Sequence, residues 1–148
     1  MSQIENSEVI RKVLDKLIEI SSRKTTGGYA ISVMNSLIKK LEERYDFLRH
    51  IEIKDTRFSE DDNSITVMSD VDSVSPTEVG KAVHAIIFTM NRTLGKDAGH
   101  FFIRELLHNI GGEYHSTIKD MGVDLNLMQL EHEIDELEKR LFHERKID

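Results

Sequence analysis

Ser75-Pro76-Thr77-Glu78 is the stretch around which the fold is organised, because it carries the residue types that begin a helix. Ser75 suits the N-cap, Pro76 the first helical position and Glu78 the reciprocal position of a capping box. Apolar residues then recur at helical spacing: Val79, Val83, Ile86, Ile87 and Met90. We therefore predict a helix that begins at this stretch and ends at Gly95.

Upstream, two helices are predicted to form a helical hairpin. The first starts at Asn6 or Ser7, either of which can cap it, and ends before Thr25. Gly27-Gly28 permit only a short break, so the second helix is expected to fold back on the first, with an apolar stripe that runs from Ala30 through Leu41 to Tyr45.

Between this helical hairpin and Ser75 the apolar period changes from the helical spacing to two. Ile51 and Ile53 alternate with charged residues, and Ile65 and Val67 resume the pattern after an acidic turn. This alternation predicts a central β-hairpin. A lone hairpin is marginally stable in water, so its apolar face must lie on the helices or its edge must pair with another strand.

Downstream of Gly95, three C-terminal helices are predicted. Asp97 caps the first, which bears Phe102, Ile103, Leu106, Leu107 and Ile110. Gly111-Gly112 interrupt it, and a short second helix stops at Gly122. In the helix that follows Ser75, the interior glycine Gly80 indicates that a neighbouring element approaches the helix closely. The predicted fold class is thus α+β, mainly helical.

The last helix is long and amphipathic, and its apolar residues follow spacings of four and three. They are Val123, Leu127, Leu130, Ile134, Leu137 and Leu141. A parallel self-pair would set Glu133 against Glu138 and would also oppose two arginines, so it is disfavoured. An antiparallel pair brings Glu133 near Arg140 of the partner, although Glu131 then meets Glu138. Docking of this stripe on the same chain is the alternative.

Composition narrows the class of protein. The 148 residues suit one domain, 1–148, and the absence of cysteine excludes disulfides and thiol chemistry. A net charge of −7 opposes non-specific binding to nucleic acid or anionic membrane. No apolar run is long enough to span a bilayer, so we expect a cytoplasmic protein without a membrane partner.

Histidines are the main candidates for chemistry. His84 lies in an apolar helix, where a buried histidine with a hydrogen-bond partner is the ordinary explanation and contact with a ligand the sharper one. Glu105 and His108 match one Glu-x-x-His of a di-metal site, but no second such pair exists. Because His108 falls opposite the apolar face of its helix, we expect it to face solvent and predict no metal or cofactor.

Two other function classes remain open. A metal-dependent or general acid–base enzyme would require His84, His108, Glu105 or the Asp70/Asp72 pair to converge in one pocket. A DNA-binding regulator of winged-helix type would use a basic edge formed by Lys39, Lys40, Arg44 and Arg49. That reading lacks the usual third helix before the wing, and acidic residues occupy the tip of the wing.

The second half carries a resemblance. Leu94-Gly95-Lys96-Asp97-Ala98-Gly99-His100-Phe101-Phe102-Ile103-Arg104-Glu105 and Met121-Gly122-Val123-Asp124-Leu125 resemble small archaeal proteins regarded as sensory or output modules of signalling systems. With the heptad stripe, this favours a non-catalytic regulatory or protein-interaction module. We expect it to be homodimeric, to contact a further protein partner through Leu127, Leu130, Ile134, Leu137 and Leu141, and to sense a small ligand near His84.

Overall fold

The computed structural model describes residues 4–24, 27–53, 65–98 and 102–146. It is mainly helical, with one antiparallel pair of strands, as the sequence predicts. The α-helices are α1 (Asn6–Lys24), α2 (Gly27–Leu41), α3 (Pro76–Ala98), α4 (Phe102–Ile110), α5 (Gly112–Asp120) and α6 (Leu125–Lys146). The strands are β1 (Ile51–Ile53) and β2 (Ile65–Val67), and short 3-10 helices η1 (Asp46–His50) and η2 (Ser69–Ser73) flank them.

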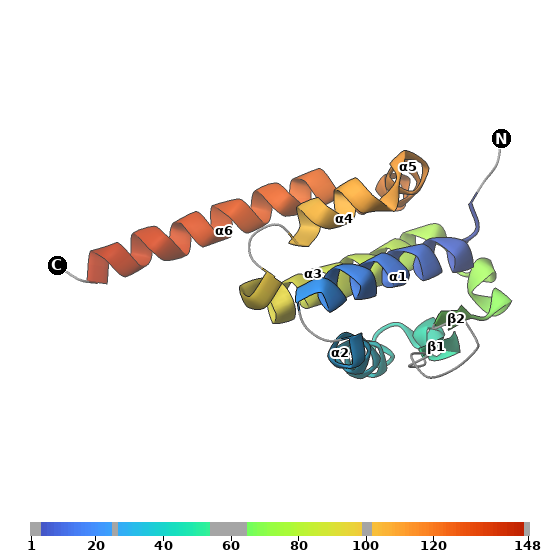
Figure 1. Cartoon of the computed structure of the whole chain (residues 1–148). Helices are drawn as coiled ribbons and strands as arrows, with labels where there is room; N and C mark the ends of the chain where they lie inside the picture. The colour runs from blue at the N-terminus through green and yellow to red at the C-terminus, as the bar shows by residue number, and fades with distance from the viewer. Residues whose placement is uncertain (1–3, 25–26, 54–64, 99–101, 147–148) are drawn as a thin grey trace.

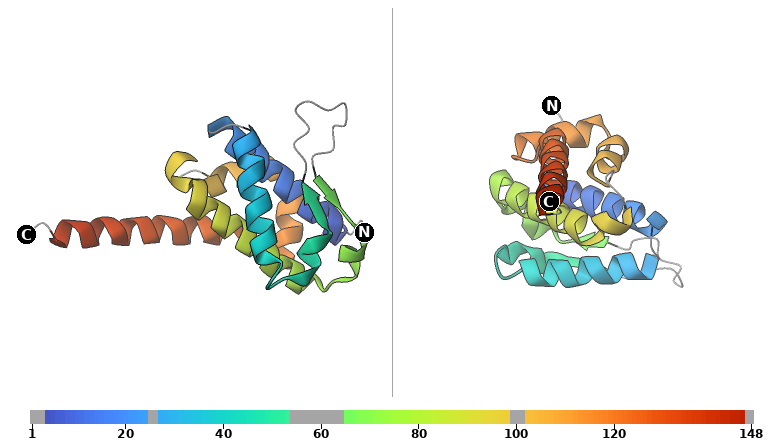
Figure 2. Two further views of the ribbon diagram at one scale, coloured as in Figure 1. Left: turned by 90° about the horizontal axis from the view of Figure 1, so that it is seen from below. Right: turned by 90° about the vertical axis from the view of Figure 1, so that its left-hand side faces the viewer.

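The elements stack in three layers (Figure 1, Figure 2). α1 and α3 lie side by side in the middle, α2 and the strands cover one face, and α4, α5 and α6 cover the other. Buried apolar side chains from all three layers form one cluster, centred on the fully buried Ile10, Leu14, Leu17, Met34, Ile86, Ile87, Met90 and Leu106. The apolar stripes of α1 and α3 supply much of this core, which is why they occupy the middle layer.

The β-hairpin packs on the helices rather than standing free. Ile51 pairs with Val67, and Ile53 pairs with Ile65. Both isoleucines of β1 and Ile65 of β2 are buried against the core. The amide of Asn35 on α2 donates a hydrogen bond to the carbonyl oxygen of Ile53 at 3.2 Å, which ties β1 to α2. The predicted acidic turn lies outside the described residues.

α3 begins at Pro76, as its capping sequence predicts, but it continues through Gly95 to Ala98. The predicted stop at Gly95 is therefore wrong, and the backbone of Asp97 belongs to the last turn of α3. A single glycine costs about 1 kcal/mol in a helix interior, which surrounding structure can offset. The Glu78 carboxylate contacts the Lys81 ammonium at 3.3 Å.

α5 ends at Asp120 and is terminated by Gly122, as predicted, through a Schellman arrangement. Gly122 has a φ of 101°, and its N–H donates to the carbonyl of Lys119 while the N–H of Val123 donates to that of Ile118. Val123 and Ile118 are both fully buried, which adds the apolar contact that usually accompanies this cap. The cap turns the chain into α6 and leaves Val123 in the core.

The start of α1 is held by η2, far away in sequence. The N–H of Ser7 donates to Asp72 Oδ1 at 2.8 Å, and the buried Asn6 amide donates to the carbonyls of Val71 and Val74 at 3.1 and 2.7 Å. Asn6 is the first residue of α1, so the predicted start is confirmed. The Asp72 carboxylate, which accepts the Ser7 N–H, caps this end of the helix from a distant part of the chain.

Within the described ranges, the structure contains no helix with the length and apolarity required to cross a membrane.

Candidate functional site

The inner side of α6 docks on the body of the molecule. Leu125, Met128 and Gln129 of its first two turns are buried. His132 follows on the same side, where its Nδ1 lies 3.2 Å from the side-chain nitrogen of Asn91 on α3. Successive helical residues are about 100° apart, so these four positions share one face. This face accounts for the attachment of α6.

A second apolar face of α6 points away from the body. Successive residues are rotated by about 100° around the helix axis, so the middle of the predicted stripe lies roughly 160° around α6 from Leu125. The stripe is therefore on the side opposite the docked face. Its members remain exposed: Leu127 51%, Leu130 51%, Ile134 47%, Leu137 55% and Leu141 52%. No described residue of the same chain covers them. Val123, which the spacing assigned to this stripe, is instead fully buried and precedes α6.

α6 also extends beyond the body. Arg104 of α4 forms an ion pair with Glu133 at 3.0 Å. From Ile134 onward the described side chains of α6 are exposed or half-buried. Figure 1 and the left view of Figure 2 show this C-terminal half of α6 continuing past the ends of the other helices. The stripe therefore lies half over the body and half on a projecting helix.

His84 lines a groove along α3, but it is half-buried rather than buried. The expectation that His84 is a buried core residue is therefore wrong. Among the described residues the ring contact of His84 is with Phe88, at 6.3 Å between centroids and 8° between planes. The reason is position: His84 and Phe88, four residues apart on α3, both line the groove between the ends of α2 and α5.

The metal candidates stay apart from this groove. Glu105 is half-buried and His108 is exposed on α4, as its spacing predicts. Neither residue lines the groove of His84, and neither does Asp70 or Asp72. In the portion of the chain that the structure describes, no three His, Asp or Glu side chains gather closely enough to hold a metal ion.

Asp72 has a structural role, capping α1. Desolvation raises its pKa, but hydrogen bonds from the Ser7 N–H, the Glu5 carboxyl and the Ser7 hydroxyl outweigh this and hold the pKa below its usual value. The hydrogen bond to Asp72, followed by the negative charge of Asp72, raises the pKa of Glu5. Neither shift was foreseeable from sequence, because both arise from contacts across the fold.

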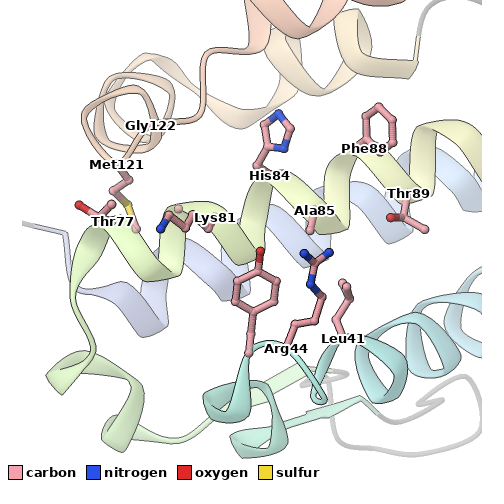
Figure 3. Close-up of a pocket in the computed structure, with 12 residues that line it drawn as sticks. Leu41, Arg44, Thr77, Lys81, His84, Ala85, Phe88, Thr89, Met121 and Gly122 are labelled. Carbon is pink, nitrogen blue, oxygen red and sulfur yellow. The ribbon is translucent and has the colours of Figure 1, made fainter.

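The basic edge of the winged-helix hypothesis is only partly assembled. Lys39, Lys40 and Arg44 are exposed near the end of α2, and Arg49 pairs with Asp46 within η1. α2 leads through η1 directly into β1, with no third α-helix between them. Arg44 lies instead in the groove with His84 (Figure 3).

No protein-family model matches this chain, and no curated protein or solved structure shows significant similarity to it.

Proposed function

We propose that this chain is a non-catalytic, cytoplasmic regulatory or interaction module that assembles as a homodimer through the outward face of α6. The observation that carries the proposal is the exposed stripe of Leu127, Leu130, Ile134, Leu137 and Leu141 on a helix already docked by its opposite face. Contiguous exposed apolar surface of this kind is typical of association sites. The resemblance of the second half to archaeal sensory or output proteins supports a role in signalling.

A second copy fits this face in antiparallel orientation. Opposing Ile134 to Leu137 and Leu130 to Leu141 buries these residues of both copies in a continuous seam, and Leu127 lies at each end of it. The same register places Glu133 near Arg140 of the second copy, twice by symmetry. It also opposes Glu131 and Glu138, so the charges favour this orientation over the parallel one without making it strong.

The shape of the chain leaves room for that orientation. α6 has 22 residues and is therefore about 33 Å long. In an antiparallel pair the first half of the second copy's α6 lies along the projecting half of this α6, and the body of the second copy lies on the far side of its own α6. Each projecting half then gains a neighbour that its own chain does not provide.

The affinity follows from the amount of apolar surface. Burying a Leu or Ile fully contributes about 1.5–3 kcal/mol, so the exposed half of each stripe side chain contributes about 1 kcal/mol. Ten such side chains in the pair contribute roughly 10 kcal/mol, against an association cost of about 4–15 kcal/mol. At the lower cost, about 6 kcal/mol remains, which corresponds to a Kd of tens of micromolar. We expect a dimer that forms reversibly.

Sedimentation velocity between about 5 and 500 µM tests the proposal. The wild-type chain is expected to shift from monomer to dimer over this range. Ile134→Asp and Leu137→Asp should stay monomeric, with unchanged helical content because both side chains are exposed in the single chain. Lys139→Asp, which adds the same side chain to the solvent side of α6, is the matched control and should still dimerise.

A wild-type chain that stays monomeric at the highest concentration would reject the homodimer, and so would Asp variants that dimerise normally. If the protein is a monomer whose stripe binds only a different protein, the role as an interaction module would still hold, but the homodimer would be rejected. The enzyme alternative is tested separately, by metal analysis of protein purified without chelator. The DNA-binding alternative is tested by electrophoretic shifts measured across a range of salt concentrations.

A further inference from the structure

From the groove along α3 we infer a binding site for a small aromatic anion, one that carries a phosphate or carboxylate group on a flat ring. The inference does not depend on the role of α6, because no residue of α6 lines the groove. It rests on the size of the groove, on its two cationic side chains and on its paired rings.

The groove has the dimensions of a small-molecule site. Its volume is about 660 Å³, within the range of about 300–1,000 Å³ typical of ligand pockets. It lies between the end of α2, the middle of α3 and the end of α5 (Figure 3). Its lining is mixed: aliphatic and aromatic carbon from Leu41, Ala85, Phe88 and Met121 surrounds hydroxyl and charged groups from Tyr45, Thr77, Arg44 and Lys81.

The cations select an anion. Arg44 reaches toward α3 from the α2 side, and Lys81 lines the same groove from α3 (Figure 3). The chain as a whole carries a net charge of −7, whereas this groove is lined by two cationic side chains. Arg44 forms no ion pair with any described residue, whereas Lys81 contacts Glu78 at 3.3 Å. A guanidinium and an ammonium together suit a phosphate or carboxylate.

The rings select a flat partner. His84 and Phe88 are nearly parallel, 8° apart, and Phe88 is 52% exposed. Figure 3 shows both rings at the edge of the groove nearer α5, and Arg44 reaches into the groove from the opposite edge. A ligand ring can therefore extend the stack while its anionic group reaches across the groove to the cations. An anion without a ring, or a ring without a charge, satisfies only half of the site.

Calorimetric titration with phenyl phosphate, inorganic phosphate and phenol tests whether the site needs both the ring and the anionic group. Phenyl phosphate is expected to bind at least fivefold more tightly than either fragment. Arg44→Gln and Lys81→Gln should each weaken it by about fivefold or more, because each removes a charge-assisted contact. Arg92→Gln, which removes an exposed cation of α3 outside the groove, is the matched control and should bind as wild type does.

Substitutions of His84 distinguish stacking on the ligand ring from a purely structural role of this side chain. His84→Ala should weaken phenyl phosphate but leave inorganic phosphate unchanged, whereas His84→Phe should restore the lost affinity by keeping a ring. Phosphate that binds as tightly as phenyl phosphate would overturn the inference, as would phenyl phosphate binding that ignores Arg44→Gln, Lys81→Gln and His84→Ala. Thermal melts of each variant confirm that the fold is retained, since all three side chains are exposed or half-buried.

Discussion

A Cβ atom on Gly80 would lie 1.9 Å from the carbonyl oxygen of Met121. α3 and the end of α5 therefore approach more closely than any other residue at position 80 permits, as the glycine inside the helical pattern predicted. The obstacle is backbone, which cannot rotate away as a side chain can. The contact also fixes one end of the groove along α3, because Gly80, Met121 and Gly122 all line it.

Gly80→Ala is expected to lower the free energy of unfolding by about 1–3 kcal/mol, the usual cost of overpacking, despite the better helix propensity of alanine. Gly112→Ala is the matched control, because a Cβ there meets nothing within 4 Å and its φ is not positive. Urea denaturation should find that variant as stable as wild type or slightly more so. A Gly80→Ala protein of undiminished stability would show that the two elements separate easily.

Arg140→Glu distinguishes the two orientations of an α6 pair. In the antiparallel arrangement it replaces the attraction between Arg140 and Glu133 of the second copy with repulsion, and the Kd should rise at least threefold. In a parallel pair it would oppose a glutamate to Arg145 and tighten the dimer. Sedimentation at low salt, where exposed charges are least screened, measures the direction. Tighter association would refute the antiparallel model.

Asp72→Ala is expected to destabilise the protein by about 1 kcal/mol, because the N–H of Ser7 loses its acceptor at the start of α1. Asp70→Ala, which removes an exposed carboxylate of the same 3-10 helix, should have little effect. Thermal unfolding at pH 7 compares the two variants. Equal stability of both would mean that water replaces the carboxylate without loss.

The pH dependence of this cap has a defined sign. Since the pKa of Asp72 is lowered by folding, its contribution is present above about pH 3.9 and is lost as the pH falls through the folded-state pKa. The melting-temperature difference between wild type and Asp72→Ala should therefore shrink under acid conditions. A difference that stays constant from pH 7 to pH 3 would exclude an ionised Asp72 as the cap.

Glu5→Gln is expected to act in the opposite sense. Folding raises the pKa of Glu5, so the stabilisation from its bound proton is present below about pH 4.3 and is lost as the pH rises through the raised pKa. Glutamine keeps the neutral state at every pH. The variant should melt above wild type at pH 7 and match it near pH 3.5; a lower melting temperature at pH 7 would contradict repulsion between Glu5 and Asp72.

The fold could be predicted wherever a local pattern decides the structure. The proline at Pro76 begins α3, the glycine at Gly122 ends α5, and the alternating isoleucines form the β-hairpin. Each depends on backbone conformation or side-chain period within a few residues. Gly95 shows the limit, because the same residue type can end a helix or be tolerated inside one, and only tertiary packing decides between these outcomes.

Less of the candidate sites could be predicted from the sequence. The stripe of α6 could be read from spacing, but its exposure depends on the opposite face, where Leu125 and Met128 dock on the body. His84 was identified, yet Arg44 joins it only because the end of α2 meets α3. In the sequence Asp72 is only one of an acidic pair, and it is the fold that places it at the start of α1. These relationships join residues that no local period connects.

The bond between Ser7 and Asp72 spans 65 positions, which matters while the polypeptide is being synthesised. At about 5–20 residues per second, α1 leaves the ribosome roughly 3–13 s before the residue that caps it. A helix without its cap frays from that end, so its apolar stripe waits for partners that come later in the chain. Completion of the first helix is therefore coupled to emergence of the middle of the protein, and a nascent chain stalled before Ser73 would expose an unfinished α1 to chaperones or proteases.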